Sequence, residues 1–292
     1  MYRAAISAHF PYIDVDIICA ADDGATMPGG RAITDYDGFV VCGSTLHAYD
    51  DHPFVTNQIE TLRQVAAIGL PILASCWGLQ IACIAAGGEV AHQPAGSEVG
   101  FARNIMPNAT GRAHPLLSRR PARFDAMCIH YDEVVRLPEC ATLLASNHHS
   151  RVQAAIIPLE HSEVWAVQYH PEFDFEHLAT IYWLHGVELI TQGLFADVDD
   201  LDRHCQWLAS LSCNPDDAEA ARWLHIDDQL TNGYQRRLFV SNAGVPNTSV
   251  RVRSLSSPTF SPSTGRSSTG LGSFASVARA ASRMRADATS TS

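Results

Sequence analysis

Lysine is absent from this sequence, and all 20 basic residues are arginine. Its absence excludes a Schiff-base mechanism, which needs a lysine amine, and also the lysine contact of a phosphate-binding P-loop. The 8 cysteines include no Cys-x-x-Cys pair, so we interpret them as reduced thiols rather than as a disulfide framework or a zinc site. We predict neither a metal site nor a cofactor.

Long apolar runs are absent as well. No stretch of the sequence has the roughly eighteen consecutive apolar residues of a membrane-spanning helix. The first residues lack the charged and then apolar segments of a secretory signal. We therefore expect a cytoplasmic protein without a membrane partner. The formal net charge of -11 argues against nucleic acid as the main partner, because nucleic-acid-binding domains carry basic surfaces.

The first part of the chain alternates between strand patterns and helix patterns. With 292 residues and 46% hydrophobic content, the chain can bury one substantial core plus a smaller appendage. Alternating strands and helices are typical of parallel βαβ units, so we predict an α/β fold, a three-layer sandwich with a mostly parallel central sheet. The alternation consists of a strand at 12–19, a strand at 38–42, a helix at 53–68, a strand at 71–74 and a helix at 77–86.

The second part of the chain has a different pattern. Short strands and turns are predicted over 89–167, followed by a helix near 175–194. Further helices are predicted over 199–240. After Asn242 the composition shifts to Ser, Thr, Ala, Arg, Gly and Pro, which cannot bury enough apolar surface to offset the entropy of ordering. We therefore predict three segments: a main domain at 1–195, a helical extension at 196–242 and a disordered tail at 243–292.

Cys76 is the strongest candidate for a reactive residue. The apolar run from Pro71 to Ala74 predicts a buried strand, and the helix pattern begins at Trp77. Cys76 therefore lies on a strand-to-helix turn, where backbone N–H groups and the helix dipole favour a negatively charged thiolate. A lone cysteine is more often a buried small hydrophobe, so Cys76 needs partners before it can be interpreted as a nucleophile.

His170 and Glu172 are the candidate partners of Cys76. They follow a predicted strand, and the carboxyl ends of parallel strands are where open α/β folds place their sites. Acyl transfer also needs hydrogen-bond donors for an oxyanion, and the backbone N–H of Trp77 is one candidate. Gly43-Ser44, at the end of the strand 38–42, is the second. Met27–Gly30 is a rival for that role, but no apolar strand runs directly into it, so we interpret it as a plain turn.

Two motifs together resemble the class I glutamine amidotransferases. They read Ser75-Cys76-Trp77-Gly78-Leu79-Gln80 and Gln168-Tyr169-His170-Pro171-Glu172. Weaker landmarks resemble the stand-alone, GMP-synthase-like branch of that family. These landmarks are Tyr36-Asp37-Gly38, Gly43-Ser44, Glu98-x-Gly100, His130-x-Asp132-Glu133-Val134 and Ala145-Ser146-Asn147. The resemblance covers about residues 1–195.

The resemblance implies a flavodoxin-like sheet and hydrolysis of the side-chain amide of glutamine. By that resemblance Cys76 forms a γ-glutamyl thioester, His170 transfers the proton, and Glu172 orients His170. Gly43 and Trp77 would supply the oxyanion donors. Gln80 would help to hold the substrate glutamine, although alone it is more simply an exposed helix residue. His130 would lie near the site. The ammonia would pass to an unidentified acceptor, such as a synthase partner.

The sequence departs from the family pattern in ways that keep other functions open. The family begins with a core strand, whereas this chain starts inside what would be the first helix, so we expect one central strand to be missing. The glycine landmark reads Cys42-Gly43-Ser44 rather than Pro-Gly-Gly. Two alternatives therefore remain: a γ-glutamyl hydrolase or peptidase that acts on another γ-glutamyl bond, and a catalytically impaired regulatory or binding protein.

Overall fold

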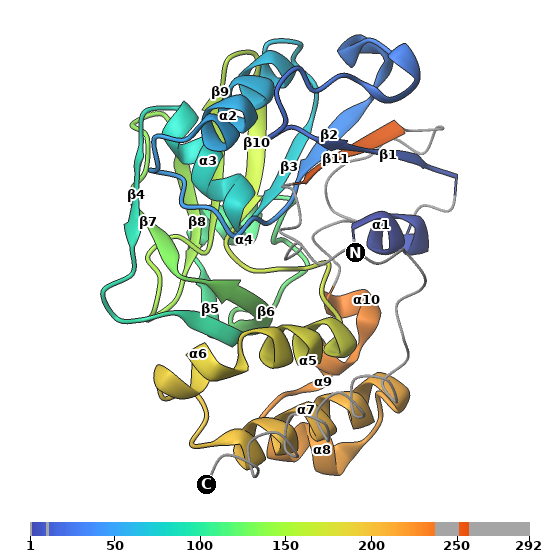
Figure 1. Cartoon of the computed structure of the whole chain (residues 1–292), viewed down its shortest axis with the longest axis vertical. Coiled ribbons are helices and arrows are strands. Elements are labelled where there is room, and N and C mark those ends of the chain that lie inside the picture. Colours follow the sequence, from blue (N-terminus) through green and yellow to red (C-terminus); the bar gives the residue numbers. More distant parts are fainter. Residues whose placement is uncertain (1, 10–11, 237–250, 257–292) are drawn as a thin grey trace, which may run out of the picture. The chain divides into compact units, whose positions relative to one another are not determined.

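A mixed β-sheet runs through the molecule, with helices on its faces (Figure 1). The computed structural model describes residues 2–9, 12–236 and 251–256, and all of them lie in one compact unit. Within these residues the sheet has nine strands in the order β1-β11-β2-β3-β10-β9-β8-β5-β6, and β4 pairs with β7 in a separate ribbon. The α/β fold predicted from the sequence is therefore confirmed.

The strands are β1 (Asp14–Cys19), β2 (Gly38–Val41), β3 (Ile72–Ser75), β4 (Glu89–His92), β5 (Glu98–Pro107), β6 (Phe124–His130), β7 (Asp132–Arg136), β8 (Thr142–Ser146), β9 (Ala154–Leu159), β10 (Ser162–Val167) and β11 (Arg251–Ser256). The helices are α1 (Tyr2–His9), α2 (Pro53–Ala66), α3 (Trp77–Ala85), α4 (Ala109–Ala113), α5 (Phe175–Leu184), α6 (Gly186–Thr191), α7 (Val198–Cys213), α8 (Ala218–Trp223), α9 (Asp228–Thr231) and α10 (Gly233–Arg236). Short η1 (Pro28–Gly30) and η2 (Ile33–Asp35) turns follow β1.

The parallel half of the sheet contains β1, β11, β2, β3 and β10. Strands β2 and β3 are buried along their whole length, which explains why they read as continuous apolar runs. Strand β10 lies beside β3, with Val167 opposite Ser75. This register brings the residues after β10 next to the turn after β3.

The other half of the sheet is antiparallel, through β10, β9, β8, β5 and β6. It corresponds to the short strands predicted over 89–167. Strands β4 and β7, which the sequence patterns did not reveal, form the ribbon beside it. The predicted βαβ units therefore supply β1, β2 and β3 of the parallel half, whereas β10 and β11 come from later segments of the chain.

Side chains alternate between two cores on the two faces of the sheet. Phe39 and Val41 of β2 belong to the core beneath α2 and α3, whereas Val40 points into the core that includes Tyr2 and Ile6 of α1. Figure 1 shows α2 and α3 packed together over the sheet. Complete burial of a Val, Leu or Phe side chain contributes about 1.5–3 kcal/mol, so these two cores hold β2 and β3 in place.

Strand β11 corrects one prediction from the sequence. Residues 251–256, which we expected in a disordered tail, lie parallel between β1 and β2. The sheet therefore has no gap where a missing central strand was expected. Composition cannot reveal such a strand, because its backbone hydrogen bonds depend on neighbours that are far away in the sequence. The rest of the predicted tail, and residues 237–242 of the predicted extension, lie outside the described residues.

The predicted helical extension contains α7 to α10, and arginine side chains connect it to the sheet. Arg103 on β5 donates hydrogen bonds to the carbonyls of Leu224 (2.8 Å) and His225 (2.7 Å), just after α8. Arg120 donates to the carbonyl of Arg236 at the end of α10 (2.8 Å). Carbonyls at helix C-termini lack partners within the helix and attract cations. The guanidinium groups therefore satisfy these helix ends and hold the extension against the sheet.

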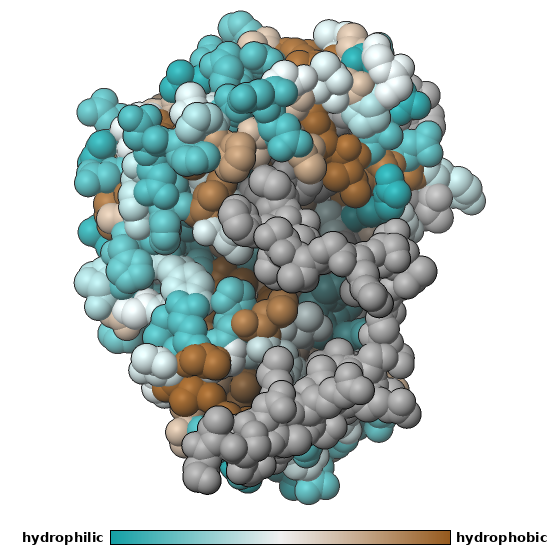
Figure 2. All heavy atoms as spheres, in the orientation of Figure 1, coloured by the Kyte–Doolittle hydropathy of each residue, from teal (hydrophilic) through white to brown (hydrophobic). Residues whose placement is uncertain are grey.

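Apolar side chains gather on the surface near α6 (Figure 2). Leu184, the last residue of α5, and Val187, in α6, are 76% and 84% exposed. Over the ranges that the structure describes, no helix is both long and apolar enough to cross a membrane.

Candidate active site

Cys76 lies in a strained turn between β3 and α3. Its backbone has φ 51° and ψ -105°, a conformation that costs a non-glycine residue about 1–3 kcal/mol. The N–H of Cys76 donates to the carbonyl of Val167 on β10 (2.8 Å), which ties the turn to the neighbouring strand. Gly78 makes the turn possible, because a Cβ at this residue would lie 2.7 Å from the carbonyl oxygen of Val41. The structure thus has the elbow geometry that the sequence predicted.

His170 and Glu172 form a buried pair beside this turn. His170 Nδ1 and Glu172 Oε1 are 2.7 Å apart, and both side chains are almost completely buried. The imidazole stacks on Phe173, with 4.0 Å between the ring centroids, and the backbone N–H of His170 donates to the carbonyl of Met127 (2.8 Å). With the ring fixed and Nδ1 facing the carboxylate, Nε2 is the nitrogen left for the Cys76 thiol.

The electrostatic environment keeps His170 protonated. Burial alone would lower the pKa of His170, but the charges of Glu172 and Cys76 outweigh it and raise that pKa from 6.5 to about 10. The positively charged imidazole of His170 therefore interacts with the sulfur of Cys76. In contrast, burial raises the pKa of Cys83 to about 11 and that of Cys205 to about 12, which makes those two thiols poor nucleophiles.

Gly43 lies against the catalytic candidates, whereas its rival does not. It follows β2, and a Cβ at this residue would lie 2.9 Å from His170 Cε1. Ser44, the next residue, accepts a hydrogen bond from the N–H of Leu46 (3.1 Å) and so stabilises the loop that begins at Gly43. The rival turn at Met27–Gly30 follows β1, which is an edge strand separated from β2 by β11.

Trp77 and Gln80 lie on the helix that follows Cys76. Trp77 is the first residue of α3, where backbone N–H groups have no acceptor within the helix. Its indole donates to the side-chain oxygen of Gln58 on α2 (2.9 Å), which anchors the start of the helix. Gln80 is buried, and its amide donates to the backbone carbonyl of Asp132 (3.1 Å). Gln80 therefore connects the nucleophile helix to β7.

His130 belongs to a buried polar network at the end of β6. Its Nε2 is 2.9 Å from Glu98 Oε2, and its Nδ1 is 3.1 Å from the backbone oxygen of Asp132. The same carboxylate accepts hydrogen bonds from Asn147 (2.6 Å) and Gln153 (2.8 Å). Burial alone would raise the pKa of Glu98, but these hydrogen bonds lower it below its ordinary 4.5. Glu98 is therefore an ionised, buried carboxylate whose two oxygens both accept hydrogen bonds.

Ile129 connects this network to the nucleophile, because its carbonyl accepts a hydrogen bond from Cys76 Sγ (3.4 Å). Sequence reasoning quoted Glu98 and Asn147 only as family landmarks and missed Gln153 altogether. The two landmark motifs, Glu98-x-Gly100 and Ala145-Ser146-Asn147, were the signal that could have revealed the network.

Tyr2 on α1 is a further neighbour of the site that sequence reasoning missed. Burial first, and then the charge of Glu172, raise the pKa of the Tyr2 hydroxyl well above its ordinary value. Ser75, next to Cys76, also interacts with this hydroxyl. The N-terminal helix therefore contributes a phenol to the surroundings of the His170–Glu172 pair.

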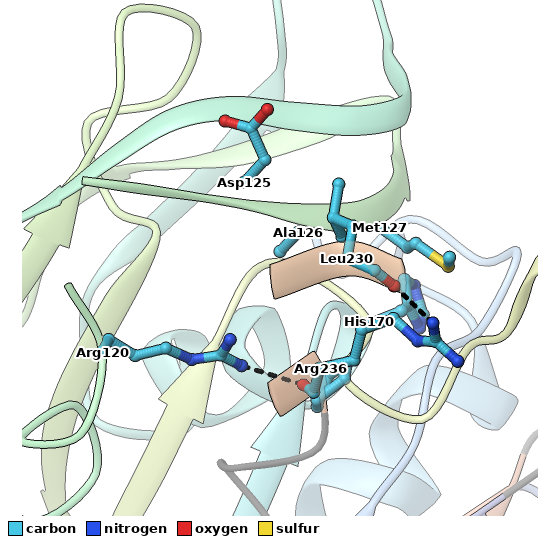
Figure 3. Close-up of a pocket in the computed structure, with 8 residues that line it drawn as sticks. Arg120, Asp125, Ala126, Met127, His170, Leu230 and Arg236 are labelled. Atoms are coloured by element: carbon cyan, nitrogen blue, oxygen red, sulfur yellow. Dashed lines mark hydrogen bonds between the residues drawn. The ribbon is translucent and has the colours of Figure 1, made fainter. Parts of the chain in front are cut away.

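A hollow beside His170 is bordered by the C-terminal helices (Figure 3). In it the guanidinium of Arg120 donates a hydrogen bond to the backbone carbonyl of Arg236. The guanidinium of Arg236 donates to the backbone carbonyl of Leu230. The helical extension thus reaches the segment that carries the candidate base. The residues that line the hollow are Arg120, Asp125, Ala126, Met127, His170, Pro171, Leu230 and Arg236.

A cysteine on a strained strand-to-helix turn, beside a buried histidine–carboxylate pair in an α/β fold, is the arrangement of a cysteine-dependent amide hydrolase. Comparison with known proteins agrees with this class. Residues 17–180, more than half of the chain, match the family "Glutamine amidotransferase class-I". The chain belongs to this family of enzymes.

Individual relatives extend the comparison. A γ-glutamyl-L-1-hydroxyisopropylamide hydrolase from a Pseudomonas species is 31% identical over 241 residues, which are 81% of this chain and 80% of that protein. The γ-glutamyl peptidase 3 of Arabidopsis thaliana is 30% identical over 158 residues, 53% of this chain, and the match spans only 62% of the peptidase. A crystal structure of a glutamine amidotransferase from Methylobacillus flagellatus shares the fold, with a TM-score of 0.55 at 19% identity, over 77% of this chain and 82% of that one.

Proposed function

We propose that this enzyme hydrolyses γ-glutamyl amide bonds through a covalent intermediate on Cys76. The observation that carries the proposal is the elbow at Cys76, held against β10 beside the buried His170–Glu172 pair. The buried network around Glu98 adjoins Ile129, whose carbonyl contacts Cys76 Sγ, and each oxygen of the Glu98 carboxylate accepts a hydrogen bond.

In the first half of the reaction, Cys76 Sγ attacks the γ-carbonyl carbon of the substrate and His170 Nε2 holds the thiol proton. The carbonyl oxygen becomes an oxyanion, which the backbone N–H groups of Gly43 and Trp77 stabilise. The C–N bond then breaks, and His170 transfers its proton to the leaving amine. The products of this half are the free amine and a γ-glutamyl thioester on Cys76.

In the second half, water attacks the thioester carbon and gives a proton to His170 Nε2. The second oxyanion collapses, the C–S bond breaks, and the sulfur leaves as a thiolate paired with the His170 imidazolium. Glutamate is released. Glu172 holds the imidazole in one orientation and stabilises its charge throughout, without itself taking a proton.

We further propose that the leaving group is an organic amine, so that the substrate is a secondary γ-glutamyl amide. The support is the Pseudomonas hydrolase, whose name describes such an amide and whose similarity extends over 81% of this chain. Hydrolysis of free glutamine, with ammonia passed to an acceptor such as a synthase partner, is the second candidate. The match to the class-I family over residues 17–180 favours it.

A substrate panel tests both candidates. The purified full chain is given free glutamine, a γ-glutamyl dipeptide, a γ-glutamyl hydroxyalkylamide and the matching α-glutamyl compounds, and released glutamate is measured for each. We expect γ-glutamyl substrates to be cleaved, α-glutamyl controls to be inert, and the kcat/KM of the hydroxyalkylamide to exceed that of glutamine. A higher kcat/KM for glutamine would favour the second candidate, and no release from any γ-glutamyl compound would refute both.

A further inference from the structure

We propose that Asp132 is a positioning residue that fixes both sides of the oxyanion hole relative to each other. The inference rests on the proposed function, in which Gly43 and Trp77 donate to the oxyanion. These two donors lie on different elements, the loop after β2 and the start of α3. An oxyanion hole works only if its donors stay aimed at one point, so something has to hold the loop and the helix together.

The carboxylate of Asp132 holds the loop. Asp132 is the first residue of β7 and is only 4% exposed. His47 Nδ1 lies 2.7 Å from Asp132 Oδ2, and the hydroxyl of Tyr49 donates to Asp132 Oδ1 (3.2 Å). His47 and Tyr49 also stack on each other, with 5.3 Å between their ring centroids. Both belong to the loop that begins at Gly43, so one buried carboxylate restrains that loop a few residues beyond its oxyanion donor.

The backbone oxygen of Asp132 holds the helix. It accepts a hydrogen bond from the side-chain amide of Gln80 (3.1 Å), and Gln80 follows Trp77 by one turn of α3. It also lies 3.1 Å from His130 Nδ1, which connects it to the Glu98 network. The same residue therefore contacts both elements that carry the proposed donors.

The other groups facing the Asp132 carboxylate fit a positional rather than a chemical role. His92 Nδ1, on the paired strand β4, lies 3.5 Å from Asp132 Oδ1. His92 and His47 are both solvent-exposed, with side-chain exposures of 63% and 46%. Because these two histidine side chains are exposed, they can be substituted without disturbing the core. The buried Asp132 carboxylate that they contact cannot move freely.

The inference predicts a defect confined to steps that form an oxyanion. Removing one donor of an oxyanion hole lowers kcat by about 10²–10³, and displacing the donors should cost less, about 10–100-fold. KM should change by less than about threefold, because the ground-state carbonyl gains little from these donors. Alkylation of Cys76 by iodoacetamide should keep its rate, because displacement at a saturated carbon forms no oxyanion.

The experiment compares Asp132→Asn, His47→Ala and His47→Gln with the wild type and with Asp51→Asn. Asp51 is an exposed acid at the end of the same loop, just before α2, so its variant controls for the loss of one charge. For each protein, hydrolysis of a γ-glutamyl amide and iodoacetamide labelling of the Cys76 peptide are measured. We expect kcat to fall in Asp132→Asn and His47→Ala, to recover partly in His47→Gln, and to stay at the wild-type value in Asp51→Asn, with equal labelling throughout.

Two results would overturn the inference while leaving the proposed function intact. One is a full kcat in both Asp132→Asn and His47→Ala. The other is a loss of hydrolysis matched by an equal loss of iodoacetamide labelling, which would mean that the nucleophile itself had been disturbed. A wild type that is labelled at Cys76 but cleaves no γ-glutamyl amide would instead overturn the proposed function and this inference with it.

Discussion

Gly43 stands so close to His170 that a methyl group at residue 43 would lie 2.9 Å from the imidazole Cε1. The loop after β2 is therefore packed directly against the imidazole of the residue proposed as the base. Because Nδ1 of the same ring lies 2.7 Å from Glu172 Oε1, the imidazole can move away from residue 43 only by giving up that contact.

Gly43→Ala should therefore reduce both the activity and the stability of the enzyme. The added methyl group would turn His170 away from Glu172 and Cys76, and misplacement of this kind lowers turnover by about 10²-fold or more. The free energy of unfolding should also fall, by about 1–3 kcal/mol, because the displaced imidazole leaves the buried Glu172 carboxylate without its partner. Denaturant unfolding and γ-glutamyl amide hydrolysis, measured side by side, check this. A variant with wild-type turnover would show that the loop yields instead of the imidazole.

Glu172→Gln should shift the pH dependence of the reaction. The pKa of His170 is about 10 with Glu172 and Cys76 beside it, and removal of an opposite charge typically shifts a pKa by about 1–3 units. In the proposed mechanism the leaving amine takes its proton from the His170 imidazolium, so the alkaline limb of kcat/KM should move to lower pH in the variant. A pH–rate profile of both proteins measures the shift, and an unmoved alkaline limb would assign that limb to another group.

The His170–Glu172 pair should also make the free energy of unfolding depend on pH. The pKa of His170 is raised from 6.5 to about 10 in the folded protein. Its contribution to the free energy of unfolding is therefore complete below pH 6.5 and is lost as the pH rises through 10. The stability difference between wild type and Glu172→Gln should follow this course, shrinking towards high pH.

Glu98→Gln should destabilise the protein at neutral pH and much less at acid pH. The pKa of the Glu98 carboxyl lies below its ordinary 4.5 in the folded state. Its stabilising effect is therefore present above pH 4.5 and disappears as the pH falls through the lowered pKa. Loss of a charged acceptor in a buried network costs about 1.5–3 kcal/mol.

The matched control for this prediction is Glu89→Gln. Glu89 is an exposed glutamate whose carboxylate lies 3.5 Å from Arg136 Nε, and such surface pairs contribute about 0–1 kcal/mol. Urea unfolding of the three proteins at neutral and acid pH is the measurement. Equal stability of Glu98→Gln and Glu89→Gln at neutral pH would contradict the assigned role of the network.

The local parts of the site could be predicted from the sequence, and the long-range parts could not. The turn at Cys76 follows from an apolar strand that runs directly into a helix pattern, and Gly43 follows from the strand before it. Their signals lie within a few residues. The link from Asp132 to His47 spans 85 positions in the chain, and no local pattern marks either residue as a partner of the other.

Strand β11 and Tyr2 illustrate the same limit. The segment Arg251–Ser256 has little apolar character, and only its pairing with β1 and β2 defines it as a strand. Tyr2 reads as an ordinary apolar helix residue until the fold brings it beside Glu172. In each case the position is set by tertiary contacts, which outweigh local propensity.

The central claim is that Cys76 forms a γ-glutamyl thioester, and the most direct test is to trap that intermediate. The wild-type enzyme is mixed with a γ-glutamyl amide, quenched in acid during turnover, and digested for mass spectrometry, with Cys76→Ala and Cys83→Ala treated in parallel. We predict that the peptide containing Cys76 gains the mass of one γ-glutamyl group in the wild type and in Cys83→Ala, and that Cys76→Ala gains none and releases no glutamate. Glutamate release by Cys76→Ala at the wild-type rate would contradict the account.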